Sequence, residues 1–167
     1  MRHRSAGRLA FALAALWAGH AGAAPRVTPS GLPVPRYVSL KFDTVNARGG
    51  PGDDYKLLWV YRAWGLPLQV VAETKEWRRV CDPSGGLAWV KSTGVDSRRT
   101  VMRTQPGAVP LLARPQPSAS VKVYLASRAV ATLLKCQAGW CQVRTSGRSG
   151  WAPASALWGA DDRLQCH

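Results

Sequence analysis

The stretch that decides the fold is Val45–Tyr55, which reads VNARGGPGDDY. Its centre, GPG at residues 50–52, ends a β-type segment sharply, because proline fixes φ and glycine accepts positive φ values. Arg48 precedes this turn and offers five N–H donors to a carboxylate or a backbone carbonyl. Such turns recur for folding reasons alone, so the first interpretation is architectural: Arg48 and Asn46 hold a long loop in shape.

Short β-type segments flank this loop and recur along the chain, separated by turn residues about every eight to twelve positions. This spacing is typical of a small barrel or sandwich. No amphipathic helix of useful length follows residue 23, and only residues 154–157 could form a helical turn. The sequence therefore predicts an all-β protein. The strand-like segments are residues 57–61, 68–72, 78–80, 121–125, 131–134 and 142–144.

The second half of the chain repeats the first half weakly. Trp77 matches Trp140 and Trp89 matches Trp151, and each pair lies beside strand residues. We therefore expect these four tryptophans to belong to the core. The repeat implies two units of about 60 residues, which are marginally stable alone and would gain from docking or a covalent link.

The loop motif and the tryptophans together resemble the bacterial SH3-like domain, and more narrowly the exported proteins that carry two such domains in tandem. The resemblance implies two small SH3-like β-barrels, at residues 36–97 and 98–160, followed by a C-terminal tail at residues 161–167. The second copy lacks the loop motif and is degenerate. The first copy departs at two positions, where Ala47 replaces a larger aliphatic residue and Ala88 replaces glycine.

The resemblance also implies a ligand groove beside the first long loop. Four aromatic residues crowd into residues 55–64, and one strand cannot turn all of them inward. Some must be exposed, and exposed amphipathic aromatics indicate recognition. The candidate ligand-binding residues are Asn46, Arg48, Tyr55, Trp59 and Trp64, with Trp64 assigned to a surface for a partner protein.

The cysteines are four in number, and local geometry favours one pairing. If residues 138–139 form a two-residue turn, Cys136 faces Cys141 across the hairpin with Cα atoms about 4.5 Å apart, which is within disulfide range. Cys81 and Cys166 would then form the second bridge. A metal or redox site is the alternative, but the chain has no C-x-x-C motif, and two structural disulfides are favoured.

The N-terminus has the three zones of a cleavable secretory signal over residues 1–23, and a Pro-rich, flexible leader follows at residues 24–35. Its apolar run, residues 9–18, is too short for a bilayer core, which needs about 20 residues, so no stable membrane span is expected. The predicted location is periplasmic or extracellular. Cleavage would remove three arginines and no acid, which lowers the net charge from +14 to +11.

The residues that remain after cleavage offer little for catalysis. His167 is then the one histidine left, and no pair of acids is placed for acid–base work. No nucleic-acid-binding motif appears, so the basic charge indicates envelope polyanions or a solvated surface. We expect a non-catalytic binding module of the bacterial envelope, without metal or cofactor, that recognises cell-wall peptide, glycan or a partner protein. A structural adaptor is the alternative, and a thiol-dependent enzyme is the least favoured class.

Overall fold

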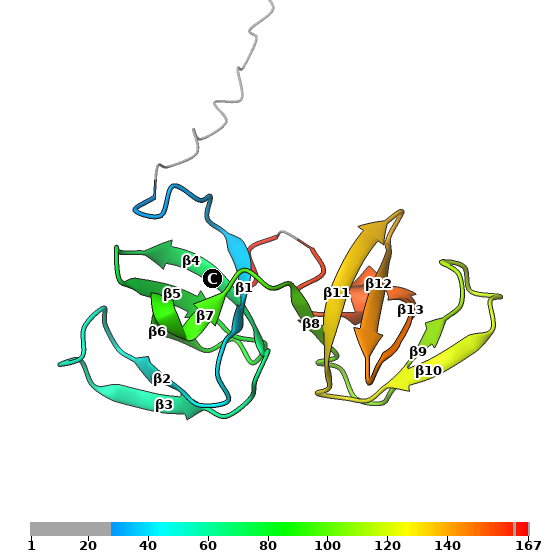
Figure 1. Ribbon diagram of the computed structural model, residues 1–167, viewed down its shortest axis with the longest axis horizontal. Helices are drawn as coiled ribbons and strands as arrows, with labels where there is room; N and C mark the ends of the chain where they lie inside the picture. The colour runs from blue at the N-terminus through cyan, green and yellow to red at the C-terminus, as the bar shows by residue number, and fades with distance from the viewer. Residues whose placement is uncertain (1–27, 162, 167) are drawn as a thin grey trace, which may run out of the picture.

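The computed structural model describes residues 28–161 and 163–166, and each half of the chain forms its own β-sheet (Figure 1). The predicted signal peptide lies outside the described residues. In the first half the strands are β1 (Arg36–Leu40), β2 (Val45–Arg48), β3 (Leu57–Tyr61), β4 (Pro67–Glu73), β5 (Trp77–Cys81), β6 (Leu87–Lys91) and β7 (Val95–Asp96). In the second half they are β8 (Thr100–Met102), β9 (Val109–Leu112), β10 (Val121–Leu125), β11 (Val130–Gln137), β12 (Trp140–Thr145) and β13 (Arg148–Pro153).

The two sheets share one topology. The first has the order β3-β2-β6-β5-β4-β1-β7, and the second has the order β10-β9-β13-β12-β11-β8, so six strands correspond one to one. Two 3₁₀ turns, η1 (Ser92–Gly94) and η2 (Ala154–Ala156), follow β6 and β13 at equivalent points. The structure thus confirms the all-β prediction of two tandem SH3-like domains. Across the described residues, no helix has the length and apolar character needed to cross a bilayer.

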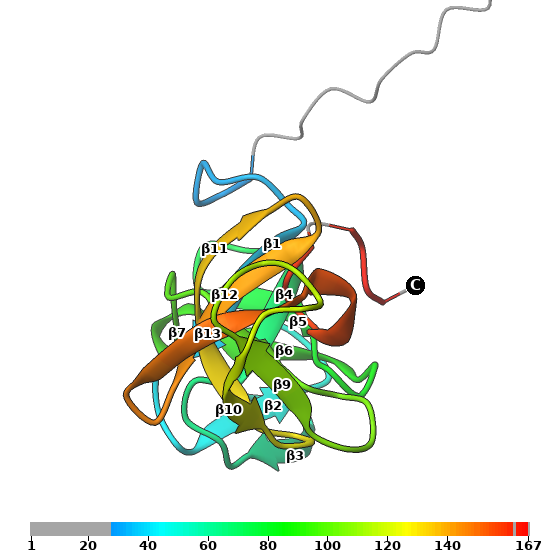
Figure 2. The same cartoon turned by 90° about the vertical axis from the view of Figure 1, so that its right-hand side faces the viewer.

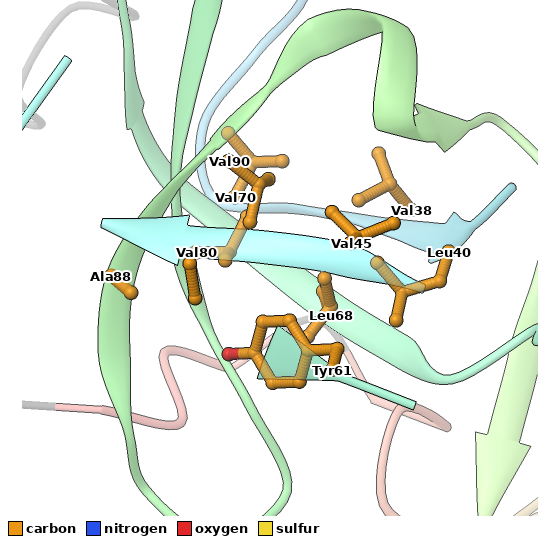
Figure 3. Packing of buried hydrophobic residues seen from close by; sticks show 10 residues of the cluster. Val38, Leu40, Val45, Tyr61, Leu68, Val70, Val80, Ala88 and Val90 are labelled. Carbon is orange, nitrogen blue, oxygen red and sulfur yellow. The ribbon is translucent and has the colours of Figure 1, made fainter. Parts of the chain in front are cut away.

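Each barrel has a separate hydrophobic core. In the first barrel, side chains from β1, β2, β4, β5 and β6 converge, and Leu40, Leu68 and Val80 are fully buried (Figure 3). In the second barrel, Leu111 and Val143 take the same central role. Burial alternates along β2 and β6 because successive side chains point to opposite faces of a sheet, whereas β1 and β4 contain four consecutive buried residues.

The tryptophan prediction is only half right. Trp77 and Trp151 are buried, but Trp89 and Trp140 are only half-buried. Strand alternation gives the reason for Trp89: its neighbours on β6 are both buried, so its own side chain faces away from the core. Trp140 likewise precedes the fully buried Cys141 on β12.

The two barrels dock through a small buried polar seam. The hydroxyl oxygens of Ser39 in β1 and Thr100 in β8 lie 2.6 Å apart, and Thr100 donates to the carbonyl of Gly65 at 2.7 Å. Beside the seam, Tyr37 and Trp158 meet edge to face with ring centroids 5.3 Å apart. Both ends of the chain's second half therefore contact the first barrel.

The C-terminal tail returns to the first barrel, as the red segment of Figure 1 shows. Gln69 of β4 accepts a hydrogen bond from the backbone of Gln165 at 2.8 Å and donates one to the carbonyl of Arg163 at 2.7 Å. Cys166 then forms a disulfide with Cys81 at the end of β5. Figure 2 shows the same tail, in red, in the view turned by 90°.

The described part of the predicted leader, residues 28–35, is attached to the first barrel. Ser30 donates through its backbone N–H to Glu73 at 2.9 Å, and Val34 packs against the first core. These contacts make residues 28–35 part of the barrel's surface, although the proline content alone predicted a flexible segment.

Candidate functional site

The first long loop, residues 49–56, joins β2 to β3 and is held from both ends. The backbone of Gly49 donates to the carbonyl of Lys56 at 3.0 Å, and Arg48 Nη1 donates to the carbonyl of Tyr55 at 2.9 Å. The ring of Tyr55 lies over Gly50, where a Cβ atom would come within 2.1 Å of it. Glycine is therefore required at Gly50, and the architectural interpretation of Arg48 agrees with the bonds it makes.

A cavity of about 230 Å³ lies beside this loop and includes two of the predicted residues, Asn46 and Arg48. Asp53 connects its two basic groups, with Lys91 Nζ at 2.6 Å and Arg48 Nη2 at 3.9 Å. The Lys91 ammonium lies 5.7 Å from the centre of the Trp77 ring. The cavity, called the loop groove below, thus combines an exposed amide, an aromatic surface and a network of charges.

Trp59 does not belong to the loop groove. It pairs across the strands with the fully buried Ala47, whereas Asn46 pairs with Val60. Because neighbouring residues of a strand face opposite sides, Trp59 and Asn46 point to opposite faces of the β2–β3 hairpin. The expectation of one groove that contains both residues is wrong. The indole packs edge to face on Tyr61 instead, with centroids 5.9 Å apart.

Trp64 also stands apart from the loop groove. Its side chain is 59% exposed, and the guanidinium of Arg98 lies 4.4 Å from its ring centre. Arg98 in turn bonds Asp96 at 2.6 Å. Together with the exposed Tyr55, Trp64 fulfils the expectation that some aromatics of residues 55–64 face solvent, whereas Tyr61 is buried.

A larger cavity, of about 540 Å³, opens between the two barrels. We call it the inter-barrel cavity. Asp82 lies at its edge, is 8% exposed, and accepts hydrogen bonds from the Tyr61 hydroxyl at 3.0 Å and from the backbone of Ser84 at 2.7 Å and Gly86 at 3.0 Å. Burial and the negative charge of Asp82 raise the pKa of Tyr61, so its phenol stays protonated and donates to the carboxylate.

Sequence reasoning missed this second cavity. In the sequence, Asp82 is one of several acids beside turns, and its partner Tyr61 is 21 residues away, on β3. The nearest signal was the turn chemistry of residues 82–86, in which an aspartate side chain bonds the backbone a few residues on. This pattern predicts a turn but does not predict the cavity beside it.

Neither cavity shows a metal site or a reactive thiol. Within residues 28–161 and 163–166, no group of three histidine, cysteine, aspartate or glutamate side chains is arranged to hold a metal ion. All four cysteines form the two disulfides that the sequence predicts, Cys81–Cys166 and Cys136–Cys141. The hairpin register pairs Cys136 directly with Cys141, and their Cα atoms are 4.0 Å apart.

Comparison with known proteins identifies the family of both barrels. The family model of the bacterial SH3 domain matches twice, at residues 41–96 and 101–159, which together are more than half of the chain. Bacterial SH3 domains are generally binding modules. A comparison with curated protein sequences found no match.

Two solved structures show a distant likeness to this chain. NlpC2 from Trichomonas vaginalis is similar at 11% sequence identity and a TM-score of 0.34, over 74% of this chain and 48% of that protein. NlpC1 from the same organism is similar at 11% identity and a TM-score of 0.34, over 74% of this chain and 45% of that protein. This chain therefore spans about half the length of either protein.

Proposed function

Since the chain belongs to the bacterial SH3 domain family, we propose that it is an exported, non-catalytic binding module of the bacterial cell envelope that recognises cell-wall peptide or glycan through the first barrel. The observation that carries the proposal is the loop groove, where Asn46, Arg48 and Lys91 line a cavity together with the exposed Phe42 and the buried Trp77. The exposed Tyr55 belongs to the adjoining loop and does not line the groove. Amide, cation and aromatic groups in one concave site are the usual means of holding a polar polymer.

Export is part of this proposal. Two disulfides support it, because such bonds persist in oxidising compartments outside the cytoplasm. The sequence of residues 1–23 supports it as well, since it has the charge and hydrophobic pattern of a secretory signal. Exposed cations on a chain whose net charge after cleavage would be +11 would add attraction to the anionic polymers of the envelope.

The test is co-sedimentation of the disulfide-bonded protein with purified sacculi across a range of salt concentrations. The informative variant combines Asn46→Ala with Tyr55→Ala, which removes two exposed side chains of the loop region. The control is Tyr124→Ala, because Tyr124 is a 62% exposed aromatic on β10 of the second barrel and lines neither cavity. We expect the double variant to lose binding and the control to keep it.

Three results would contradict the proposal. Absence of co-sedimentation at low salt would remove wall binding altogether. Equal loss in the double variant and in Tyr124→Ala would show that the loop groove has no special role. Binding that disappears steeply with salt in all proteins would indicate charge alone.

A partner-protein adaptor is the second candidate function, and Trp64 favours it. A tryptophan that is 59% exposed and carries an arginine on its face is the type of residue that anchors protein interfaces. Under this alternative, Trp64→Ala abolishes capture of an envelope protein while sacculus binding is absent from the start. The two candidates are thereby separated by which variant has an effect.

A further inference from the structure

The inter-barrel cavity has the size and composition of a ligand site. Its volume of about 540 Å³ falls within the usual range for small-molecule pockets, about 300–1,000 Å³. The first barrel contributes Tyr61, Arg62 and Asp82, and the second contributes Met102 and Arg128. Because both barrels supply side chains, the cavity exists only while the barrels are docked.

The carboxylate of Asp82 retains a place for one more hydrogen bond. An ionised carboxylate has about four acceptor positions. Asp82 Oδ1 accepts from the backbone of Ser84 and Gly86, and Oδ2 accepts from the Tyr61 hydroxyl. Three positions are thus used, and the fourth, on Oδ2, has no hydrogen-bond donor among the described residues.

The two arginines at the cavity are free of competing contacts. Arg62 and Arg128 are exposed, and across the described residues neither guanidinium makes an ion pair or a hydrogen bond. Other arginines of the chain are engaged, for example Arg36 and Arg78 with Glu73. Guanidinium groups bind carboxylates through paired N–H donors, so Arg62 and Arg128 provide anion-binding capacity from both sides of the cavity.

We propose that the inter-barrel cavity is a second binding site, for the carboxyl-terminal end of a peptide. The terminal carboxylate lies between Arg62 and Arg128, and the last amide N–H of the peptide donates to Asp82. Leu66 and Met102 offer apolar surface to the terminal side chain, and methionine adapts to side chains of different shape. The proposal is independent of the loop groove, because the two sites share no lining residue.

The test is a titration with N-acetyl-alanyl-alanine followed by NMR, with the indole N–H of Trp59 as a reporter beside Tyr61. The L,L and D,D isomers and their C-terminal amides are compared on the disulfide-bonded protein at low salt. We expect one or both acids to bind and the matching amides to bind at least about tenfold more weakly, because the charged hydrogen bonds are lost. The preferred isomer then distinguishes a D-residue of the cell wall from an ordinary protein terminus.

The decisive variants are Arg62→Gln and Arg128→Asn, each expected to weaken binding at least about tenfold. Arg128 has φ 63°, a conformation that asparagine tolerates well, so this substitution leaves the turn intact. Arg144→Gln is the control, since Arg144 is exposed on β12 outside the cavity and its loss lowers the charge equally.

Three outcomes would overturn the proposal: no binding of either acid at millimolar concentration, equal binding of acid and amide, or equal weakening by Arg144→Gln. The variant that combines Asn46→Ala with Tyr55→Ala should bind the dipeptide normally. Loss of sacculus binding in that variant with dipeptide binding intact would show that the two sites act separately.

Discussion

The two barrels have the same strand order, but several polar side chains of the first barrel are missing at the equivalent positions of the second. Strand registers align Arg48 of β2 with Leu112 of β9, because each pairs with a tryptophan of the neighbouring strand, Trp89 in one case and Trp151 in the other. In this alignment, four polar residues of the first barrel correspond to residues that lack the same charge, amide or phenol group. The replacements are Leu125 for Tyr61, Thr145 for Asp82, Pro110 for Asn46 and Pro153 for Lys91.

The two copies of the fold thus keep similar cores and carry different polar side chains. Both barrels keep the apolar residues that make a core, so each remains a stable scaffold. At the positions of Asn46 and Lys91 the second barrel has prolines, which carry neither an amide side chain nor a charge. The second barrel contributes instead to the wall of the inter-barrel cavity, through Met102 and Arg128. Sequence degeneracy in the second copy therefore removes polar groups of the loop groove and retains the fold.

The disulfides give the largest test of the comparison. Cys81–Cys166 ties the tail to the first barrel across a sequence separation of 85, whereas Cys136–Cys141 closes a hairpin with a separation of 5. Replacing both cysteines of the long-range bridge by serine should lower the free energy of unfolding by up to about 4.6 kcal/mol, and the same change in the hairpin bridge by about 2 kcal/mol. Urea unfolding of the two double variants measures both values. A larger loss from the hairpin bridge would contradict the chain-entropy explanation.

Core packing provides the next test. Ala47 and Ala88 of the first barrel occupy the positions of Leu111 and Gly150 in the second. A Cβ atom on Gly150 would lie 2.8 Å from Leu111 Cβ and 2.9 Å from its backbone carbon. These atoms are common to leucine and alanine, so the close approach of the β9 backbone, and not the size of the leucine, requires glycine at position 150. The first barrel accommodates a Cβ atom at the equivalent Ala88, which is 2% exposed.

Gly150→Ala should therefore lower the free energy of unfolding by about 1–3 kcal/mol through overpacking. Leu111→Ala alone should cost about 2–5 kcal/mol through the cavity it leaves. The double variant, which copies the alanine pair of the first barrel, should cost about as much as the two single changes together, because alanine at position 111 keeps the Cβ and backbone atoms that the new methyl meets. A double-mutant cycle by urea unfolding measures the coupling. A double variant that costs clearly less than the sum would show that the leucine side chain, rather than the backbone, excludes a methyl group at position 150.

These pairs also show how far the sequence alone can predict this protein. The loop motif, the tryptophan spacing and the hairpin around Cys136 are local patterns, and they predict the fold class and one disulfide directly. Ala47 and Ala88 stand out in the sequence as two separate departures from a family pattern. In the structure the two residues lie on β2 and β6, which are neighbours in the sheet, and no local sequence pattern contains this pairing.

The candidate site was predictable only in part, for a related reason. Asn46 and Arg48 flank one loop, and the structure brings both to the loop groove. Trp59 lies on the opposite face because of the strand register, which sequence spacing does not determine. The hydrogen bond between Tyr61 and Asp82 joins β3 to the turn after β5 within the first barrel, a long-range contact that no local pattern contains. The inter-barrel cavity depends on how the barrels dock, so the position of Arg128 in its lining could not be predicted either.

Arg48→Leu makes the first barrel resemble the second at the start of its long loop. The variant loses the bond from Arg48 Nη1 to the carbonyl of Tyr55 and the contact with Asp53. We expect a loss of about 1.5 kcal/mol, typical of a hydrogen bond from a charged donor, and faster hydrogen exchange at the backbone of Gly49. Arg114→Leu, in the second barrel's loop, is the control because its side chain makes no hydrogen bond in the described structure. Equal effects of both changes would mean that Arg48 is not what holds the loop.

The smallest expected effect concerns one cross-strand pair, which is an ion pair in the first barrel and a disulfide in the second. Glu73 pairs with Arg78 across β4 and β5, and the same register in the second barrel pairs Cys136 with Cys141. An ion pair with Nε to Oε2 at 3.1 Å thus occupies the place of a disulfide. Burial alone would raise the pKa of Glu73, but hydrogen bonds from Ser30 and Arg36 outweigh it and lower the pKa to about 2.

The stabilising effect of the ion pair should therefore depend on pH, whereas that of the disulfide should not. Because the folded-state pKa of Glu73 lies below the ordinary value of 4.5, its contribution to stability is complete above about pH 4.5 and is lost as the pH falls toward 2. Glu73→Gln should cost about 1 kcal/mol at pH 7, after allowance for solvent screening, and almost nothing near pH 2. Serine variants of Cys136 and Cys141 should lose the same free energy at both pH values, because disulfide sulfurs do not titrate. Urea unfolding of both variants at pH 7, 4 and 2.5 separates these responses, and a loss in Glu73→Gln that stays constant down to pH 2.5 would show that Glu73 stabilises the hairpin by packing rather than by its charge.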